Sequence, residues 1–79
     1  MLDAKIVGAV LREYRKSRGL TLSVTSGLAG MSAAHLSKLE RGDKLANLDS
    51  LFKIAHALHV PPGEIVEKID HRIEKERSL

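Results

Sequence analysis

The segment SAAHLSKLERG, residues 32–42, combines small and basic side chains with two leucines. A helix advances by about 100° per residue, so turning Leu36 and Leu39 toward a core leaves four side chains facing outward: Ala34, Ser37, Lys38 and Arg41. Such a face allows another surface to approach closely, and its hydroxyl, ammonium and guanidinium groups donate hydrogen bonds to oxygen atoms. The chemistry expected here is recognition of an anionic partner.

The same helical wheel places Glu40 beside the apolar face, where an unpaired carboxylate is costly. Arg15 follows Leu11 by four residues and therefore lies near the inward face of an earlier helix. We predict that Arg15 and Glu40 form an ion pair that joins the two helices. Its role is structural, because loss of one partner leaves the other charge uncompensated.

Other groups that carry chemistry are sparse. His56, His59 and His71 are the side chains that suggest a metal site, but helical histidines are more often surface residues, and no zinc-ligand pattern accompanies them. The chain has no cysteine, which excludes disulfides and thiolate ligands. No nucleophile elbow, glycine-rich phosphate loop or acid pair occurs. We therefore expect neither an enzyme nor a bound metal or cofactor.

The composition fits one small helical domain. With one Phe, one Tyr and no Trp among 79 residues, the core must consist mainly of Leu, Ile, Val and Ala. Residues 1–41 hold seven bases and three acids, whereas residues 42–79 hold six bases and seven acids. This asymmetry suits a polyanion-binding N-terminal half, although a solvated basic face is the simpler alternative. No membrane-spanning run or secretory signal is visible, so we expect a soluble, cytoplasmic protein.

Capping residues and apolar spacing divide the chain into five helices. The predicted N-caps are Asp3, Thr21, Ser32 and Asn47, and the helices that they open end near Ser17, Ala29, Arg41 and Val60. Pro62 lies in the first turn of the fifth helix, which is expected to continue to about residue 77.

The second and third predicted helices are joined by the very short turn Gly30-Met31-Ser32. So short a turn forces a steep crossing, which is the geometry of a helix-turn-helix. Each helix has only about two turns and is stable only when other helices cover it. The shared core beneath them is predicted to contain Leu28, Met31, Leu36 and Leu39.

The segments LREYRKSRGLTLSVTSGLAGMSAAHLSKLERG and LDSLFKIAHALHVPPGEI resemble the phage repressor and Cro type of helix-turn-helix protein, the XRE family. The resemblance covers roughly residues 6–66, and its most specific parts are RGLT, AGMS, LSKLERG and LxxLxKIAxALxV. It implies an all-α, five-helix lambda-repressor-like bundle with an extended C-terminal helix. It also implies the ion pair between Arg15 and Glu40. We expect residues 1–79 to form this single domain, with the helix-turn-helix at about residues 21–41.

The resemblance implies sequence-specific binding of double-stranded DNA, with the third helix in the major groove. The predicted base-contacting residues are Ala33, Ala34, Ser37 and Lys38. Lys38 is best suited to O6 and N7 of guanine, and alanine can contact a thymine methyl group. Backbone amides at helix starts and side chains at the groove rim are expected to hold phosphates. The predicted backbone contacts are Thr21, Ser32, His35, Arg41, Lys44 and Asn47, with His35 as a further group for base readout.

Three positions depart from the family pattern. Leu22 replaces a Gln that touches the DNA backbone, so that contact is lost. Ala33 and Ala34 occupy base-reading positions although their side chains cannot form hydrogen bonds. Thr25 replaces a buried Leu, so either its hydroxyl is satisfied locally or the second helix is packed less tightly.

The C-terminal segment EIVEKIDHRIEKERSL predicts an amphipathic helix. Ile65 and Val66 are expected to close the monomer core. Ile69 and Ile73 extend beyond the minimal bundle and are predicted to form a homodimer interface, which makes residues 62–77 a dimerisation helix. The alternative is that this extension folds back on the first helix of its own chain.

A dimer would present two copies of the third helix to an inverted repeat, with half-site centres about 34–36 Å apart or a multiple of that. The function expected on this basis is a small transcription regulator that represses by occupying a promoter. The competing hypothesis is a protein-interaction module of the co-regulator or anti-repressor type, which keeps the fold without specific DNA binding. Ala33 and Ala34 favour that alternative, and loss of DNA retention in Lys38→Glu would favour the first.

Overall fold

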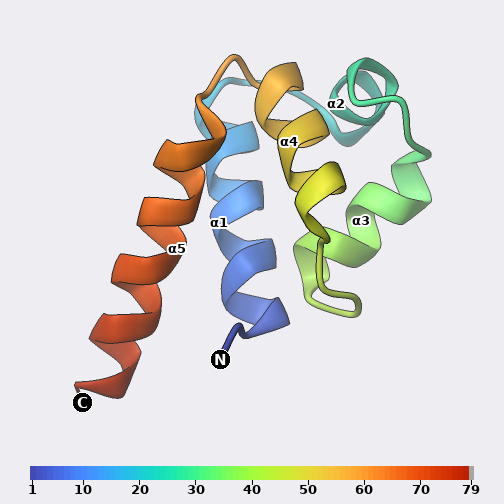
Figure 1. The fold of residues 1–79 in the computed structure, drawn as a ribbon. Coiled ribbons are helices and arrows are strands. Elements are labelled where there is room, and N and C mark those ends of the chain that lie inside the picture. Colours follow the sequence, from blue (N-terminus) through green and yellow to red (C-terminus); the bar gives the residue numbers. More distant parts are fainter. Residues whose placement is uncertain (79) are drawn as a thin grey trace.

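The computed structural model describes residues 1–78, which form five helices and no strand (Figure 1). The helices are α1 (Ala4–Ser17), α2 (Leu22–Leu28), α3 (Ala33–Arg41), α4 (Leu48–Ala57) and α5 (Pro62–Arg77). The all-α, five-helix prediction is confirmed. Within residues 1–78, no helix combines the length and the hydropathy needed to span a membrane.

The first four helices each begin at a polar side chain that accepts a hydrogen bond from a backbone amide of the first turn. The distances between acceptor and amide nitrogen are 2.8 Å for Asp3, 3.1 Å for Thr21, 3.0 Å for Ser32 and 2.8 Å for Asn47. Each such cap stabilises its helix by about 1 kcal/mol. Helix α5 instead begins with Pro62. Proline has no amide hydrogen, but an amide in the first turn would have no carbonyl partner within the helix, so no hydrogen bond is lost. The predicted helix starts are therefore confirmed.

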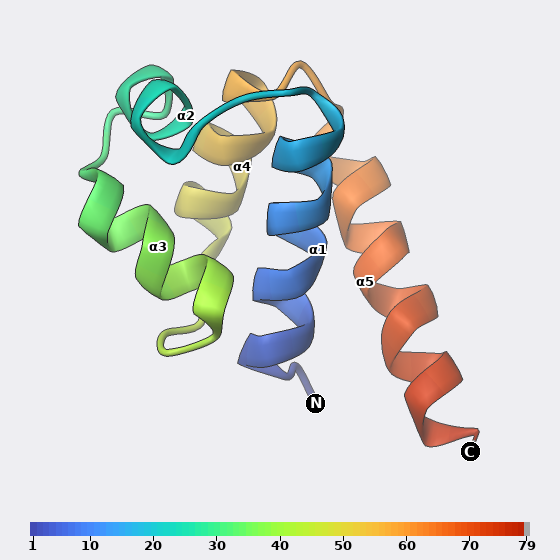
Figure 2. The ribbon, with the colours of Figure 1, turned by 180° about the vertical axis from the view of Figure 1, so that it is seen from behind.

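Helix α1 lies in the middle of the fold, with α3 and α5 packed against it (Figures 1 and 2). Helix α4 packs on α2 and α5, and α2 packs on α3. Figure 2 shows α2 nearly end-on while α3 runs across the view, so the two helices cross steeply. The segment from α2 to α3 is a helix-turn-helix.

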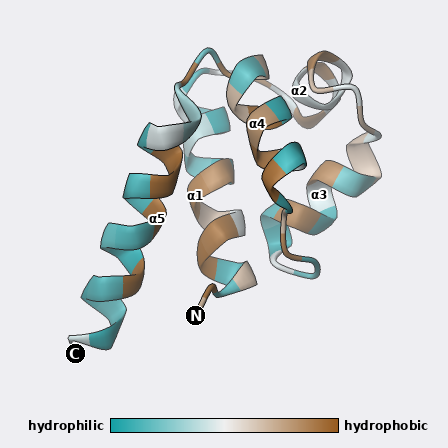
Figure 3. Cartoon of the chain, in the orientation of Figure 1, coloured by the Kyte–Doolittle hydropathy of each residue, from teal (hydrophilic) through white to brown (hydrophobic). Residues whose placement is uncertain are grey.

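The core lies where the apolar sides of α1, α3, α4 and α5 meet (Figure 3). Leu11, Leu36, Ile54 and Ile65 are almost completely buried. The prediction that Leu28 joins this core is wrong, because 64% of Leu28 is exposed. Its neighbour Ala29 is buried instead, which means that α2 is rotated so that its last leucine faces outward.

Thr25 lies on the buried side of α2 and is completely inaccessible to solvent. Its Oγ1 atom has no hydrogen-bond partner. Of the two alternatives for this position, local satisfaction of the hydroxyl is therefore not found among residues 1–78. A buried hydroxyl without a partner destabilises the folded state by about 1–3 kcal/mol.

Helix α5 folds back along α1. Tyr14 of α1 donates a hydrogen bond of 2.9 Å to Glu64, and Arg72 donates bonds of 2.8 and 3.1 Å to Glu13. Bonding to Arg72 lowers the pKa of Glu13, and burial together with the bond to Glu64 raises the pKa of Tyr14. Polar contacts therefore fix both the start and the later turns of α5 on α1.

This arrangement bears on two predictions for α5. Ile69 is only 5% exposed within a single chain, so its burial needs no partner copy. The dimer role of Ile69 and Ile73 stays a prediction. Ile73 is half-buried and also packs against the core, which leaves less of it for an interface than predicted. Val66, expected in the core, is 46% exposed. It lies about 100° around α5 from the buried Ile65 and close to Ile73, and both Val66 and Ile73 line a groove.

Candidate nucleic-acid interface

The predicted base-contacting residues lie together on the outer side of α3. Ala33, Ala34 and Lys38 are exposed, and Ser37 is half-buried beside them. The opposite side of α3 is buried through Leu36 and Leu39. Two alanines in the first turn give this end of α3 a low, accessible surface, and the first amides of a helix have no carbonyl partner within it. This surface can enter a groove and offer both amide and ammonium donors.

Arg41 makes contacts at the end of α3 that sequence reasoning missed. Its Nε donates a bond of 3.0 Å to Asp43, and its Nη1 donates a bond of 3.1 Å to Oγ of Ser37. The spacing of Ser37 and Arg41, four residues apart on a helix, could have indicated the second contact. Arg41 is therefore available to an anion only in competition with Asp43.

The remaining predicted backbone contacts lie at helix starts and in the connection after α3. Gly42 takes a left-handed φ of 76° and turns the chain toward Lys44 and Asn47, both of which are exposed. Thr21, Ser32 and Asn47 use their side-chain oxygens to cap helices, so the Asn47 NH₂ group stays available as a donor. His35 is half-buried and is the least accessible of these residues.

Arg15 fixes the position of α3 relative to the rest of the fold. Its Nε and Nη2 donate bonds of 2.7 and 3.0 Å to the two carboxylate oxygens of Glu40. Its Nη1 donates a third bond of 2.7 Å to the carbonyl of Leu20, at the entrance to α2. Bonding to Glu40 raises the pKa of Arg15. One guanidinium group thus holds three segments: α1, the start of the helix-turn-helix, and the end of α3.

Gly8 allows α1 and α3 to approach closely, and sequence reasoning missed it. A Cβ atom at this position would lie 2.3 Å from the carbonyl oxygen of Leu39 and 2.5 Å from that of Glu40. Both distances are too short, and both atoms belong to the backbone, which cannot move aside independently. A glycine in a helix interior is destabilising relative to alanine. Its presence inside the predicted first helix could therefore have indicated a close approach of another backbone.

The histidines considered as metal ligands are not brought together. His56, His59 and His71 are all exposed. Among residues 1–78, no group of three His, Cys, Asp or Glu side chains is placed to hold a metal ion.

Known proteins share both the sequence pattern and the fold. The transcriptional regulator ClgR of Mycobacterium tuberculosis is 35% identical over 78 residues, which cover 99% of this chain and 70% of that protein. The clp gene regulator ClgR from Corynebacterium glutamicum superposes with a TM-score of 0.84 at 29% identity, covering 91% of this chain and 94% of that one.

A second structural relative is the restriction-modification controller protein C.AhdI from Aeromonas hydrophila. It has a TM-score of 0.76 at 32% identity and covers 80% of this chain and 96% of its own. Residues 11–65 match the HTH_3 helix-turn-helix family, so the match includes α2, α3 and α4 completely. This confirms the resemblance to the XRE type, and the chain belongs to the HTH_3 family of helix-turn-helix proteins.

Proposed function

We propose that this chain is a transcription regulator that binds double-stranded DNA in a sequence-specific manner, with α3 in the major groove. The observation that carries the proposal is the exposed outer side of α3, held in place by the buried Arg15–Glu40 pair behind it. A recognition surface must be both accessible and rigid, and α3 has both properties. The names of the relatives, which are transcriptional and gene regulators, support the same function.

Base readout on this proposal depends mainly on Lys38. Its ammonium group suits the paired acceptors O6 and N7 of guanine, and a good contact of this kind discriminates by about 1–3 kcal/mol. Ser37 supplies a hydroxyl, and the methyl groups of Ala33 and Ala34 suit a thymine methyl.

Phosphates position the protein without reading sequence. The residues that we assign to this role are Thr21, Ser32, His35, Arg41, Lys44 and Asn47. They flank α3 at the helix starts and in the connection before α4.

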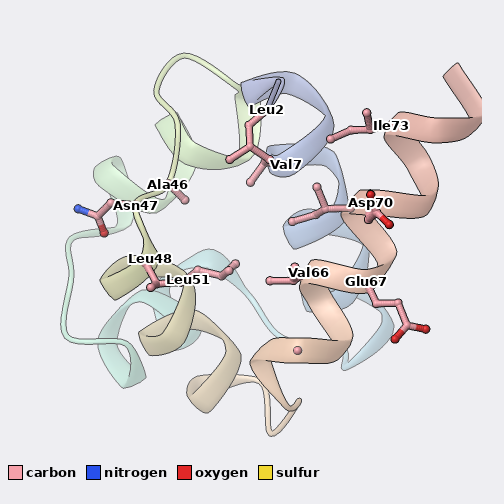
Figure 4. A pocket seen from close by; sticks show the side chains of 12 residues that line it. Leu2, Val7, Ala46, Asn47, Leu48, Leu51, Val66, Glu67, Asp70 and Ile73 are labelled. Carbon is pink, nitrogen blue, oxygen red and sulfur yellow. The ribbon is translucent and has the colours of Figure 1, made fainter. Parts of the chain in front are cut away.

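We also propose that the protein acts as a homodimer on an inverted repeat, through an apolar groove that Ile69 and Ile73 help to line. A groove of about 570 Å³ lies between α5 and the start of α4. Figure 4 shows Leu51 and Val66 pointing toward one another across it. Leu48 and Leu2 at its edges are 67% and 57% exposed, and a second copy of the chain would cover this apolar surface.

The dimer is tested by Val66→Lys, a change at an exposed position that leaves the core intact. We expect the unsubstituted chain to sediment as a dimer at micromolar concentration and the variant as a monomer. Lys68→Ala, on the same helix, is the control. If the unsubstituted chain also sediments as a monomer, the dimer is contradicted, and the assignment of α3 is unaffected.

Binding of such a dimer at a promoter would repress transcription by occupancy, in the cytoplasm, and requires no catalysis. The decisive experiment is selection from a pool of random duplexes at near-physiological salt. We expect enrichment of an inverted repeat with guanine at fixed symmetric positions. Lys38→Ala should lose the preference for that guanine, and Lys75→Ala on α5 should keep it.

A flat pool would contradict sequence-specific regulation. If Lys38→Glu also leaves DNA retention unchanged, the protein-interaction hypothesis replaces this proposal. The exposed apolar residues Leu28 and Phe52 would then be the surface to examine, since they line a shallow pocket between α2 and α4.

A further inference from the structure

Helix α1 carries three exposed basic residues on one side. Lys5, Arg12 and Lys16 are spaced by seven and four residues, which places them within about 40° of arc on a helical wheel. We call these residues the α1 basic stripe. None of the five ion pairs found among residues 1–78 involves them, so their charges are not compensated within the fold.

The α1 basic stripe borders α3. A Cβ atom added to Gly42, where α3 ends, would lie 2.7 Å from Cα of Lys5, so the backbone of α1 passes directly beside this end. Gly8 contacts the last carbonyls of α3, and the stripe is centred only about 60° around α1 from Gly8. Figure 2 shows α1 and α3 side by side, with the lower half of α1 next to the end of α3.

The side of α1 that faces α5 has a different charge. Glu13 lies there and is paired with Arg72 of α5 at 2.8 Å. The basic groups of α1 are therefore concentrated on the edge near α3 and not spread around the helix. Charged residues that served only to keep α1 solvated would not need to be separated by sign in this way.

The outer side of α3 has little uncompensated charge of its own. Arg41 is paired with Asp43 at 3.0 Å, which leaves Lys38 and the nearby Lys44. Leu22, the first residue of α2, has no polar side-chain group to offer a phosphate. The neighbouring α1 basic stripe adds three charges to a surface that is otherwise weakly basic.

We propose that the α1 basic stripe binds the phosphate backbone of double-stranded DNA beside the base pairs that α3 reads. The stripe is about 16 Å long, at 1.5 Å per residue, whereas one DNA strand presents a phosphate about every 3.4 Å along the axis. Its length therefore reaches several phosphates of one strand. This inference rests on the proposed function, because it requires α3 to face DNA.

The test compares two triple variants that change the net charge equally. In the first, Lys5, Arg12 and Lys16 are replaced by Gln, and in the second, Lys53, Lys68 and Lys75 of α4 and α5 are replaced by Gln. All six residues are exposed, and thermal unfolding checks that both variants are folded. Dissociation constants are measured between 50 and 200 mM salt on the selected duplex and on a scrambled duplex.

We expect the α1 variant to show a salt dependence that is shallower by about 2–3 in log–log slope for each bound protomer, at about 0.9 per phosphate contact. Affinity for the two duplexes should fall by the same factor, because phosphate contacts carry no sequence information. The α4 and α5 variant should bind almost as the unsubstituted chain does.

If both triple variants bind alike, the α1 basic stripe has no role in binding, and the assignment of α3 stands. If the α1 variant loses the preference for the selected duplex, the stripe reads bases and the backbone role is wrong. If the unsubstituted chain binds neither duplex, the proposed function fails, and the inference fails with it.

Discussion

Two ion pairs near the end of α3 use the same chemical groups in different surroundings. Arg15 and Glu40 lie on the inner side, with Nε and Oε2 2.7 Å apart and side chains only 10% and 5% exposed. Arg41 and Asp43 lie on the outer side at 3.0 Å, with side chains 58% and 53% exposed. The shortest distances are similar, so the two pairs differ mainly in burial, and Arg15 also donates a second bond to Glu40.

Burial determines what each pair can do. The inner pair cannot exchange its partner for water, so breaking it leaves a charge in the core. The outer pair is worth at most about 1 kcal/mol and can open when a phosphate approaches. The inner side of α3 therefore determines stability and orientation, and the outer side remains available for binding.

Glu40→Ala is the strongest test of this difference. It leaves Arg15 buried without its carboxylate and should cost about 3–5 kcal/mol in the free energy of unfolding, measured by urea denaturation. Asp43→Ala should change that free energy by less than about 0.5 kcal/mol. The double change Arg15→Met with Glu40→Leu removes both charges and should recover most of the stability, so the test holds even where Glu40→Ala does not fold. Equal effects of Glu40→Ala and Asp43→Ala would contradict the comparison.

Gly8→Ala tests whether the inner side needs its close backbone contact. The added methyl group meets the carbonyls of Leu39 and Glu40, so we expect a loss of about 2 kcal/mol or more in thermal or urea unfolding. Gly27→Ala in α2 is the matched control, because a Cβ there meets no atom within 4 Å. It should stabilise the protein by about 0.5–1 kcal/mol. A stabilising Gly8→Ala would show that α1 and α3 are farther apart than described.

Thr25→Val separates packing from polarity on the inner side of the helix-turn-helix. It keeps the shape of the side chain and removes the hydroxyl that lacks a partner, so stability should rise by about 1 kcal/mol. Thr25→Ser keeps the hydroxyl and loses a methyl group, and it should destabilise by about 1 kcal/mol. If Thr25→Val lowers the free energy of unfolding, the Thr25 hydroxyl has a hydrogen-bond partner in solution.

Asp43→Asn tests the outer pair. Removing this negative charge weakens the hold on Arg41 and takes a like charge away from the phosphates, so affinity for DNA should rise by about two- to fivefold at low salt. Fluorescence anisotropy with a labelled duplex measures the change, and Asp70→Asn on α5 should have little effect. No gain at low salt would mean that Arg41 does not approach a phosphate.

The helix boundaries could be predicted because their signals are local. The caps Asp3, Thr21, Ser32 and Asn47 act on amides two or three residues away, so the sequence near each helix start contains all the information needed. The Arg15–Glu40 pair could be predicted because two charges near apolar faces each need a partner.

The side of a short helix that is buried could not be read in the same way. In α2, the apolar residues Val24 and Leu28 share one face, yet that face is exposed. Contacts with α3 and α4 cover the side of Thr25 and Ala29 instead. For α5, the spacing of Ile65, Ile69 and Ile73 indicates that a surface covers them but not which one. That surface belongs to the same chain, where α5 packs on α1 and α4, and only the three-dimensional path reveals it.

The outer residues of α3 have a consequence for how such proteins diversify. Ala33, Ala34 and Lys38 are exposed and contribute nothing to the core, whereas Leu36, Leu39 and Glu40 on the other side maintain it. Substitutions at the three outer positions can therefore accumulate with little penalty to folding. A gene duplicate could acquire a new operator preference in a few mutational steps, and the two alanines, which have no polar group to lose, are the natural first steps.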